Sequence, residues 1–131
     1  MVPIIAVVLL HGDFTAFAGP NNNTSFSVGA LPGNAGGDFN SAFGFQALHV
    51  NLVGQDNTAT GAGALFANAD GDFNTATGRL ALGNNLAGAF NTAIGNQALF
   101  SNNNGSSNTA SGDSVLKGNV SGFGNMASGA E

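Results

Sequence analysis

The pattern of polar and apolar residues in this chain repeats every 17 positions, without insertion or deletion, from Asn23 to Asn125. With the repeated asparagine taken as position 0, the unit reads N-T-A-x-G-x-x-A-L-x-x-N-x-x-G-x-x. Positions 2, 4 and 8 hold Ala, Gly and Leu, and strand alternation would point all three to one side. A unit this short cannot bury a core by itself, so neighbouring units must stack.

Identical residues would lie over one another if the units stacked in register. The first asparagine column, at position 0, contains Asn23, Asn40, Asn57, Asn74, Asn91, Asn108 and Asn125. The second asparagine column, at position 11, contains Asn34, Asn51, Asn68, Asn85, Asn102 and Asn119. A leucine column at position 8 contains Leu31, Leu48, Leu65, Leu82, Leu99 and Leu116. We expect the asparagine amides to hydrogen-bond along the stack as ladders.

The length of the unit predicts the fold class. Helical repeats need roughly 33 residues or more, so a 17-residue unit favours an all-β, parallel β-solenoid. Each coil is expected to contain two or three strands of about 4–6 residues, with the next coil about 4.8 Å away. By the same alternation, positions 12 and 16 should also face the core. Gly at position 14 should turn a corner with positive φ, and asparagines should tolerate left-handed corners.

The sequence divides into two parts. Residues 1–20 are predicted to form an apolar strand and a degenerate partial coil, and residues 21–131 to form six full coils and a partial one. The apolar start and incomplete last coil suggest strand addition between subunits, which would build an open filament. The alternative is that the first strand folds back onto its own coils. Both arrangements remain open.

Positions 3 and 5 should face outward, which would leave an apolar patch on the first coils that something must cover. The residues expected to take part in assembly are Ile4, Ile5, Val7, Val8, Leu9, Leu10, Phe26, Phe43 and Phe45.

Composition narrows the functional classes. Two basic and seven acidic residues give a net charge of −5, so Arg79 and Lys117 alone cannot supply a nucleic-acid surface. No apolar run approaches the roughly 18 residues of a membrane helix, so we expect no membrane insertion. The chain has two histidines, no cysteine, and no motif for a nucleophile or a phosphate loop. We therefore expect neither enzyme activity nor a cofactor.

One metal hypothesis remains. Asp70 and Asp72 are close in sequence, and repeat solenoids of another type bind Ca²⁺ between coils. These two residues are therefore the Ca²⁺ candidates, although the other coils supply no column of carboxylates. The alternative interpretation is that they are solvated turn residues.

The repeat resembles a known type. The segments N-T-A-I-G-N-Q-A-L (91–99), N-T-A-T-G-A-G-A-L (57–65) and N-S-A-F-G-F-Q-A-L (40–48) resemble the head repeats of trimeric autotransporter adhesins. They are similar also to arrays in phage tail fibres and bacterial surface proteins. The resemblance covers about residues 21–131 and implies a left-handed parallel β-roll, commonly trimeric, at an extracellular surface.

Three functional hypotheses follow. The first is a structural subunit of an extracellular filament or surface fibre, on a cell or a virion, whose partner is itself and which assembles head to tail. The second is an adhesin or phage-fibre head module, a trimer that binds a host surface receptor or glycan. The third is an ice-binding surface, suggested by the Thr column at position 1, with Thr-x-Thr pairs only at Thr58/Thr60 and Thr75/Thr77.

Overall fold

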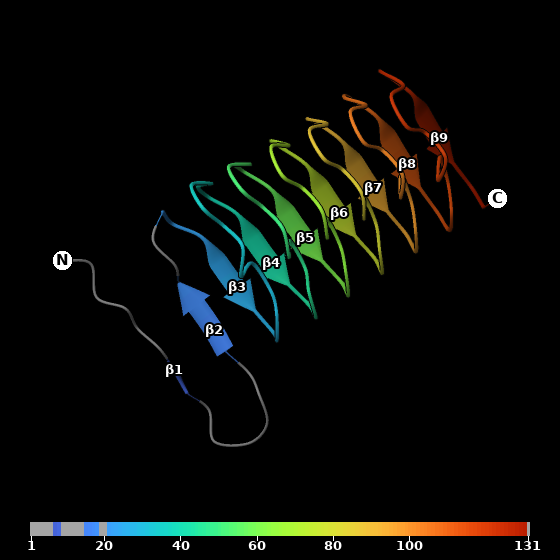
Figure 1. Ribbon diagram of the computed structural model, residues 1–131. Coiled ribbons are helices and arrows are strands. Elements are labelled where there is room, and N and C mark those ends of the chain that lie inside the picture. Colours follow the sequence, from blue (N-terminus) through green and yellow to red (C-terminus); the bar gives the residue numbers. More distant parts are fainter. Residues whose placement is uncertain (1–6, 9–14, 19–20, 131) are drawn as a thin grey trace.

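The computed structural model describes residues 7–8, 15–18 and 21–130, and this part of the chain forms one sheet of nine strands in chain order (Figure 1). The strands are β1 (Val7–Val8), β2 (Thr15–Ala18), β3 (Thr24–Phe26), β4 (Ser41–Phe43), β5 (Thr58–Thr60), β6 (Thr75–Thr77), β7 (Thr92–Ile94), β8 (Thr109–Ser111) and β9 (Met126–Ser128). We number the coils from the asparagine at position 0, so coil 1 is 23–39, coil 2 is 40–56, coil 3 is 57–73 and coil 4 is 74–90.

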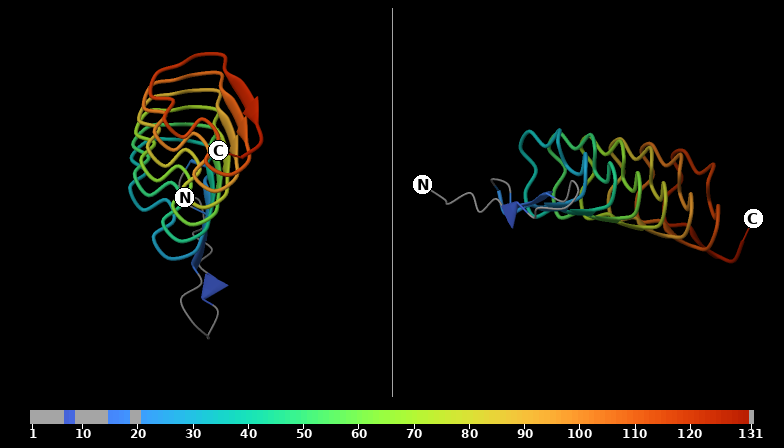
Figure 2. Two further views of the ribbon diagram at one scale, coloured as in Figure 1. Left: turned by 90° about the vertical axis from the view of Figure 1, so that its right-hand side faces the viewer. Right: turned by 90° about the horizontal axis from the view of Figure 1, so that it is seen from below.

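Strands β3 to β9 are parallel, and each residue pairs with the residue 17 positions further on, for example Ala59 with Ala76. The coils therefore stack one on the next along a single axis, with β3 and β9 at opposite ends of the row (Figure 2). The predicted all-β parallel solenoid of 17-residue coils is confirmed, and every column of the repeat lies in register.

Each coil contains one strand of three residues, so the prediction of two or three longer strands is wrong. The backbone turns too often for long strands, because φ is positive at several positions of every coil. The leucines at position 8 all have φ between 48° and 52°, and Phe39, Phe73 and Phe90 at position 16 have φ between 55° and 59°. Between these turns, single hydrogen bonds still join coil to coil, such as Leu48 N–H to Ala64 C=O at 3.0 Å.

The interior contains six columns, at positions 0, 2, 7, 8, 11 and 14. The predicted burial of Ala at position 2 and Leu at position 8 is confirmed: Ala59 and Leu65, like their equivalents in coils 2 to 5, have no exposed surface. The alanines at position 7, such as Ala64, are buried beside the leucines although strand alternation would place them outside.

The prediction that positions 12 and 16 face the core is wrong. Leu52 and Leu86 at position 12, and Phe73 and Phe90 at position 16, are all about half exposed. A left-handed residue reverses the direction of the chain locally, so alternation with a period of two does not continue from one side of a turn to the other. The left-handed leucine at position 8 therefore ends the alternation before position 12 is reached.

The N-terminal strands pair differently from the coils. Strand β2 lies antiparallel to β3, with Ala16 opposite Phe26, and β1 lies antiparallel to β2. The described part of the N-terminal segment therefore folds back onto the first coil of its own chain (Figure 1).

Candidate functional site

The first asparagine column forms a continuous hydrogen-bonded ladder in the core. In the middle of the stack, Asn74 donates through Nδ2 to the carbonyl of Gly88 at 2.8 Å and to Oδ1 of Asn57 at 3.1 Å. Its own Oδ1 accepts from the backbone N–H of Asn91 at 3.0 Å and from Asn91 Nδ2 at 3.1 Å. The predicted asparagine ladder is confirmed, and each rung joins three successive coils.

The second asparagine column forms a parallel ladder. Asn68 donates through Nδ2 to Oδ1 of Asn51 at 2.8 Å, and Asn85 donates to Oδ1 of Asn68 at 2.7 Å. The same Nδ2 of Asn85 also donates to the carbonyl of Gly88 at 2.7 Å, which already accepts from Asn74. The position-14 carbonyl therefore joins the two ladders, and no buried side-chain nitrogen or oxygen within the described residues lacks a partner.

Glycine at position 14 is required by space, and the prediction that it supplies a corner with positive φ is wrong. None of Gly54, Gly71 and Gly88 has positive φ. A Cβ on Gly54 would lie 2.7 Å from both Asn51 Oδ1 and Asn68 Nδ2, and would also contact the carbonyl of Gly71. A side chain here would disrupt the hydrogen bond between Asn68 and Asn51, two successive residues of the second ladder.

Left-handed backbone occurs elsewhere in the coil than the sequence predicted. The asparagines of the two ladders do not adopt it, whereas Gly at position 4 does, with φ of 129° at Gly61 and 131° at Gly78. A Cβ on Gly61 would lie 2.7 Å from the carbonyl oxygen of Gly78. At position 8, leucine adopts a positive φ that costs about 1–2 kcal/mol per residue. Complete burial of the leucine side chain in coils 2 to 5 offsets this cost.

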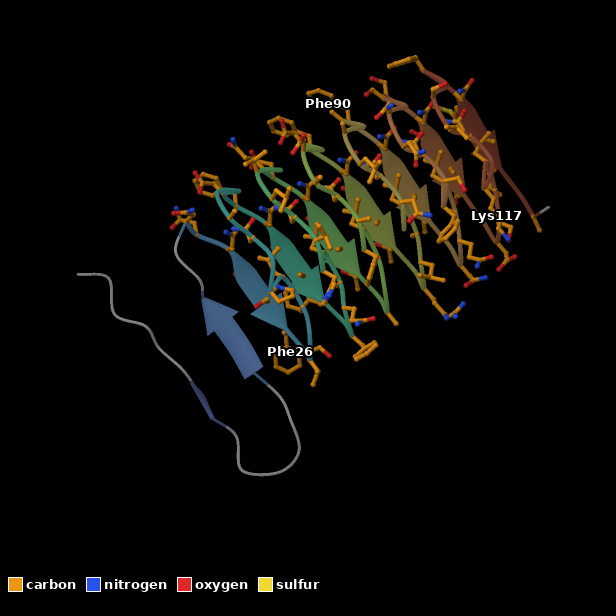
Figure 3. The ribbon with its side chains drawn as sticks, in the orientation of Figure 1. Phe26, Phe90 and Lys117 are labelled. Atoms are coloured by element: carbon orange, nitrogen blue, oxygen red, sulfur yellow. The ribbon has the colours of Figure 1, made fainter. Side chains whose placement is uncertain are left out.

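The outer surface carries the residues that differ between coils. Phe90 lies on the edge of the solenoid where the strands begin, and Phe26 lies on the edge toward which they point (Figure 3). Phe73 and Phe90 stack with ring centroids 5.0 Å apart and an angle of 4° between the rings. Apolar side chains of successive coils therefore stack on the outside of the solenoid at this pair, as they do in the interior.

The predicted assembly residues fall into three groups. Phe26 is half-buried, while Phe43 and Phe45 are 41% and 54% exposed, so the outward orientation expected at positions 3 and 5 is confirmed. Val7 and Val8 form β1, which pairs with β2 of the same chain. The other predicted assembly residues, Ile4, Ile5, Leu9 and Leu10, lie outside the described residues.

The Ca²⁺ candidates lie on the surface, with Asp70 exposed and Asp72 half-buried. Asp72 Oδ1 accepts a hydrogen bond from the backbone N–H of Gln55 at 2.7 Å, so its carboxylate binds the backbone of the preceding coil. Ser106 has the same role, since its Oγ accepts from the N–H of Ala89 at 3.0 Å. Across the described residues, no cluster of three or more His, Asp or Glu side chains is placed to hold a metal ion.

The carboxylate of Asp113 is held by two side-chain hydrogen bonds. Its carboxylate accepts from Asn96 Nδ2 at 2.9 Å and from Ser114 Oγ at 3.0 Å. These two hydrogen bonds, with a smaller contribution from the positive charge of Lys117, lower the pKa of Asp113 below its ordinary value. Lys117 lies on the same edge of the solenoid as Phe26 (Figure 3).

Comparisons with protein-family models, with curated proteins and with solved structures give no match. The class of protein is therefore defined by the geometry alone: a parallel β-solenoid of 17-residue coils with an internal asparagine ladder. Within residues 7–8, 15–18 and 21–130, no helix has the length and apolar character needed to span a bilayer.

Proposed function

We propose that the chain is a structural subunit of an extracellular filament or surface fibre, and that it works as a stiff rod. The observation that carries this proposal is the unbroken register of strands and asparagine ladders from β3 to β9. To tilt one coil away from the next, the backbone bonds and the buried amide bonds of that layer would have to break together. Such a layer resists bending, which is the property a fibre needs.

Exposed apolar columns support association between copies of the rod. Leu52 and Leu86 lie at position 12, and Phe73 and Phe90 at position 16, with about half of each side chain in contact with solvent. Phe73 and Phe90 are in contact with each other, and contiguous exposed apolar surface is typical of interaction sites. Because coils in every copy have the same spacing, side chains on one rod can match those on a second rod over several layers.

Contact along the sides is favoured over strand addition at the N-terminal end. Strand addition needs an open strand edge, whereas the edge of β3 is already paired with β2 of the same chain. A neighbouring subunit that paired with β3 would have to displace β2. The apolar columns on the sides of the rod need no such rearrangement.

The resemblance of the N-T-A-x-G-x-x-A-L repeats to adhesin heads and phage tail fibres supports an extracellular or virion-surface setting. That resemblance also supports the second candidate, a trimeric head module that binds a host receptor or glycan. The two candidates share the lateral apolar contact and differ in what the assembly becomes: a long thread or a short closed particle.

The proposal is tested on the purified chain by light scattering after size-exclusion chromatography and by negative-stain microscopy. We expect self-association, and long uniform threads in the images. The double variant Phe73→Ser/Phe90→Ser removes a stacked pair from an apolar column and should shift the protein to monomers with an unchanged circular dichroism spectrum. The matched control Thr58→Ser/Thr75→Ser changes exposed residues on the strand face and should assemble normally.

Two results would count against the proposal. A wild-type chain that stays monomeric at high concentration contradicts self-association altogether. Compact trimers without threads would contradict the filament and support the fibre-head module.

A further inference from the structure

Two adjacent columns of the solenoid, at positions 5 and 6, are interrupted by small residues. Positions 5 and 6 hold Phe45 and Gln46 in coil 2, and the large pair Arg79 and Leu80 in coil 4. In coil 3, between them, the same positions hold only an alanine and a glycine. The result is a surface notch of about 310 Å³, which is at the lower end of the range for ligand-binding pockets and has room for one small ring.

The floor of the notch is formed by Ala62 and Gly63 of coil 3, whose backbone is hydrogen-bonded to both neighbouring coils. Gly63 has φ of 67°, and a Cβ on it would lie 2.7 Å from Leu80 Cδ2, so the side chain of Leu80 covers the glycine closely. The N–H of Gly63 donates to the carbonyl of Phe45 at 2.9 Å, and the N–H of Leu80 donates to the carbonyl of Ala62 at 2.9 Å. These bonds fix the three coils that form the two walls and the floor.

The walls offer three different chemistries. Phe45 is 54% exposed, and Phe66 is half-buried and stacks on His49 with ring centroids 5.0 Å apart and 12° between the planes. Stacking on His49 keeps the ring of Phe66 in place. Gln46 contributes an amide that can both donate and accept hydrogen bonds. Arg79 is exposed at the notch and contributes a guanidinium.

We propose that this notch binds a sugar ring that carries a carboxylate. The aromatic faces present apolar surface with a negative quadrupole to the C–H groups of the ring. The amide of Gln46 hydrogen-bonds ring hydroxyls, and the guanidinium of Arg79 pairs with the carboxylate in the two-pronged geometry that arginine favours.

The positive charge that would attract a carboxylate to the notch comes from Arg79 alone and not from the net charge of the protein. The chain has a net charge of −5 and only two basic residues, and Arg79 is one of them. The protein as a whole therefore repels anions, and an anion that binds must do so by direct contact with Arg79 and the aromatic walls. This inference does not depend on the assembly of the rod, because all the lining residues belong to one chain.

The binding test uses methyl β-glucuronide as the probe, with saturation-transfer NMR and titration of the full chain. We expect a Kd in the millimolar range, typical of a single small ring, and no comparable binding of methyl β-glucoside, which lacks the carboxylate. Equal binding of the two sugars, or binding of neither, overturns the proposal. Equal binding of benzoate and the glucuronide overturns the assignment to a sugar.

Two variants locate the site. Arg79→Gln should weaken glucuronide binding at least tenfold, and the matched control Lys117→Gln, which removes the other basic side chain, should leave binding unchanged. Ala62→Phe should abolish binding because it fills the notch. Position 5 already holds phenylalanine in coil 2, at Phe45, so the solenoid accommodates that residue. Unchanged binding in Ala62→Phe, with a native circular dichroism spectrum, would place the sugar elsewhere.

Discussion

The interior and the surface of the same solenoid follow opposite rules. Inside, position 0 is asparagine in every coil and position 14 is glycine in every full coil. Outside, position 16 changes from Phe to Asp, Ser or Gly between coils, and position 5 changes from Phe to Ala to Arg. The interior repeats because each residue must fit, or hydrogen-bond to, the residues of the next layer, whereas an exposed side chain is free of that requirement.

The difference shows where structure and function are encoded. An interior built from polar amides is more demanding than an apolar one, because a buried amide without partners costs about 1–3 kcal/mol. In a uniform column every buried asparagine amide finds its partners, because the same hydrogen bonds repeat from coil to coil. The irregular residues outside, such as the phenylalanines and Arg79, are therefore the ones that distinguish this chain from any other with the same coil.

The largest expected effect comes from placing a methyl group against the second asparagine ladder. We expect Gly54→Ala to lose about 4 kcal/mol of unfolding free energy, because overpacking against backbone adds to broken amide hydrogen bonds. Denaturant unfolding followed by circular dichroism measures the loss.

The control for this change is Gly118→Ala, where a Cβ would meet nothing within 4 Å and φ is not positive. Its stability should stay within about 0.5 kcal/mol of wild type. Equal losses in the two variants would mean that position 14 is glycine for a reason other than space.

A somewhat smaller effect is expected from removing one rung. Asn74→Ala deprives the backbone N–H of Asn91 of its acceptor and removes one of the two donors to the Gly88 carbonyl. We expect a loss of about 3 kcal/mol, since buried polar groups lose partners on both sides.

The control for Asn74→Ala is a substitution of the next residue, Thr75, which is exposed on the outer surface. Thr75→Ala should cost less than about 1 kcal/mol, the span of strand propensities. Hydrogen exchange adds a local readout, because the amide of Asn91 should lose protection in Asn74→Ala only. Retained protection at Asn91 would contradict the role assigned to the ladder.

The smallest effect concerns an exposed carboxylate. The pKa of Asp113 is lowered in the folded protein, so its hydrogen bonds to Asn96 and Ser114 contribute stability above the ordinary pKa of 3.8. That contribution is lost as the pH falls through the lower, folded-state pKa.

Asp113→Ala should therefore lower Tm slightly at neutral pH and leave it unchanged in strongly acidic solution. Because the carboxylate is on the surface, the difference is expected to be small. An NMR titration that places the pKa of Asp113 at or above 3.8 would contradict this prediction.

The sequence pattern predicted which residues stack in columns, but not in every case whether a column faces the core or the solvent. Asn57, Asn68 and Leu65 were correctly placed in stacked columns, because identical residues at a constant spacing can only coincide if the coils pair in register. Phe73 and Leu86 were wrongly placed inside. Their hydrophobicity suggested burial, and nothing in the residue types at positions 8 and 16 marked these as left-handed turns.

The notch around Arg79 was also missed. The sequence shows two small residues, Ala62 and Gly63, at positions 5 and 6 of coil 3. Small residues leave a notch only where both neighbouring coils have large side chains at the same positions. That signal could have been found by comparing side-chain volumes along each outward column.

What the sequence by itself determined is the period, the parallel register and the presence of amide ladders, because a repeat this short and this exact permits only stacking of each residue on its equivalent. The tertiary structure decided which way each column faces, why position 14 must be glycine, and that β2 pairs back onto the first coil. Those features depend on where the backbone turns left-handed and on contacts between residues in different coils, and neither is encoded in the spacing of residues along the chain.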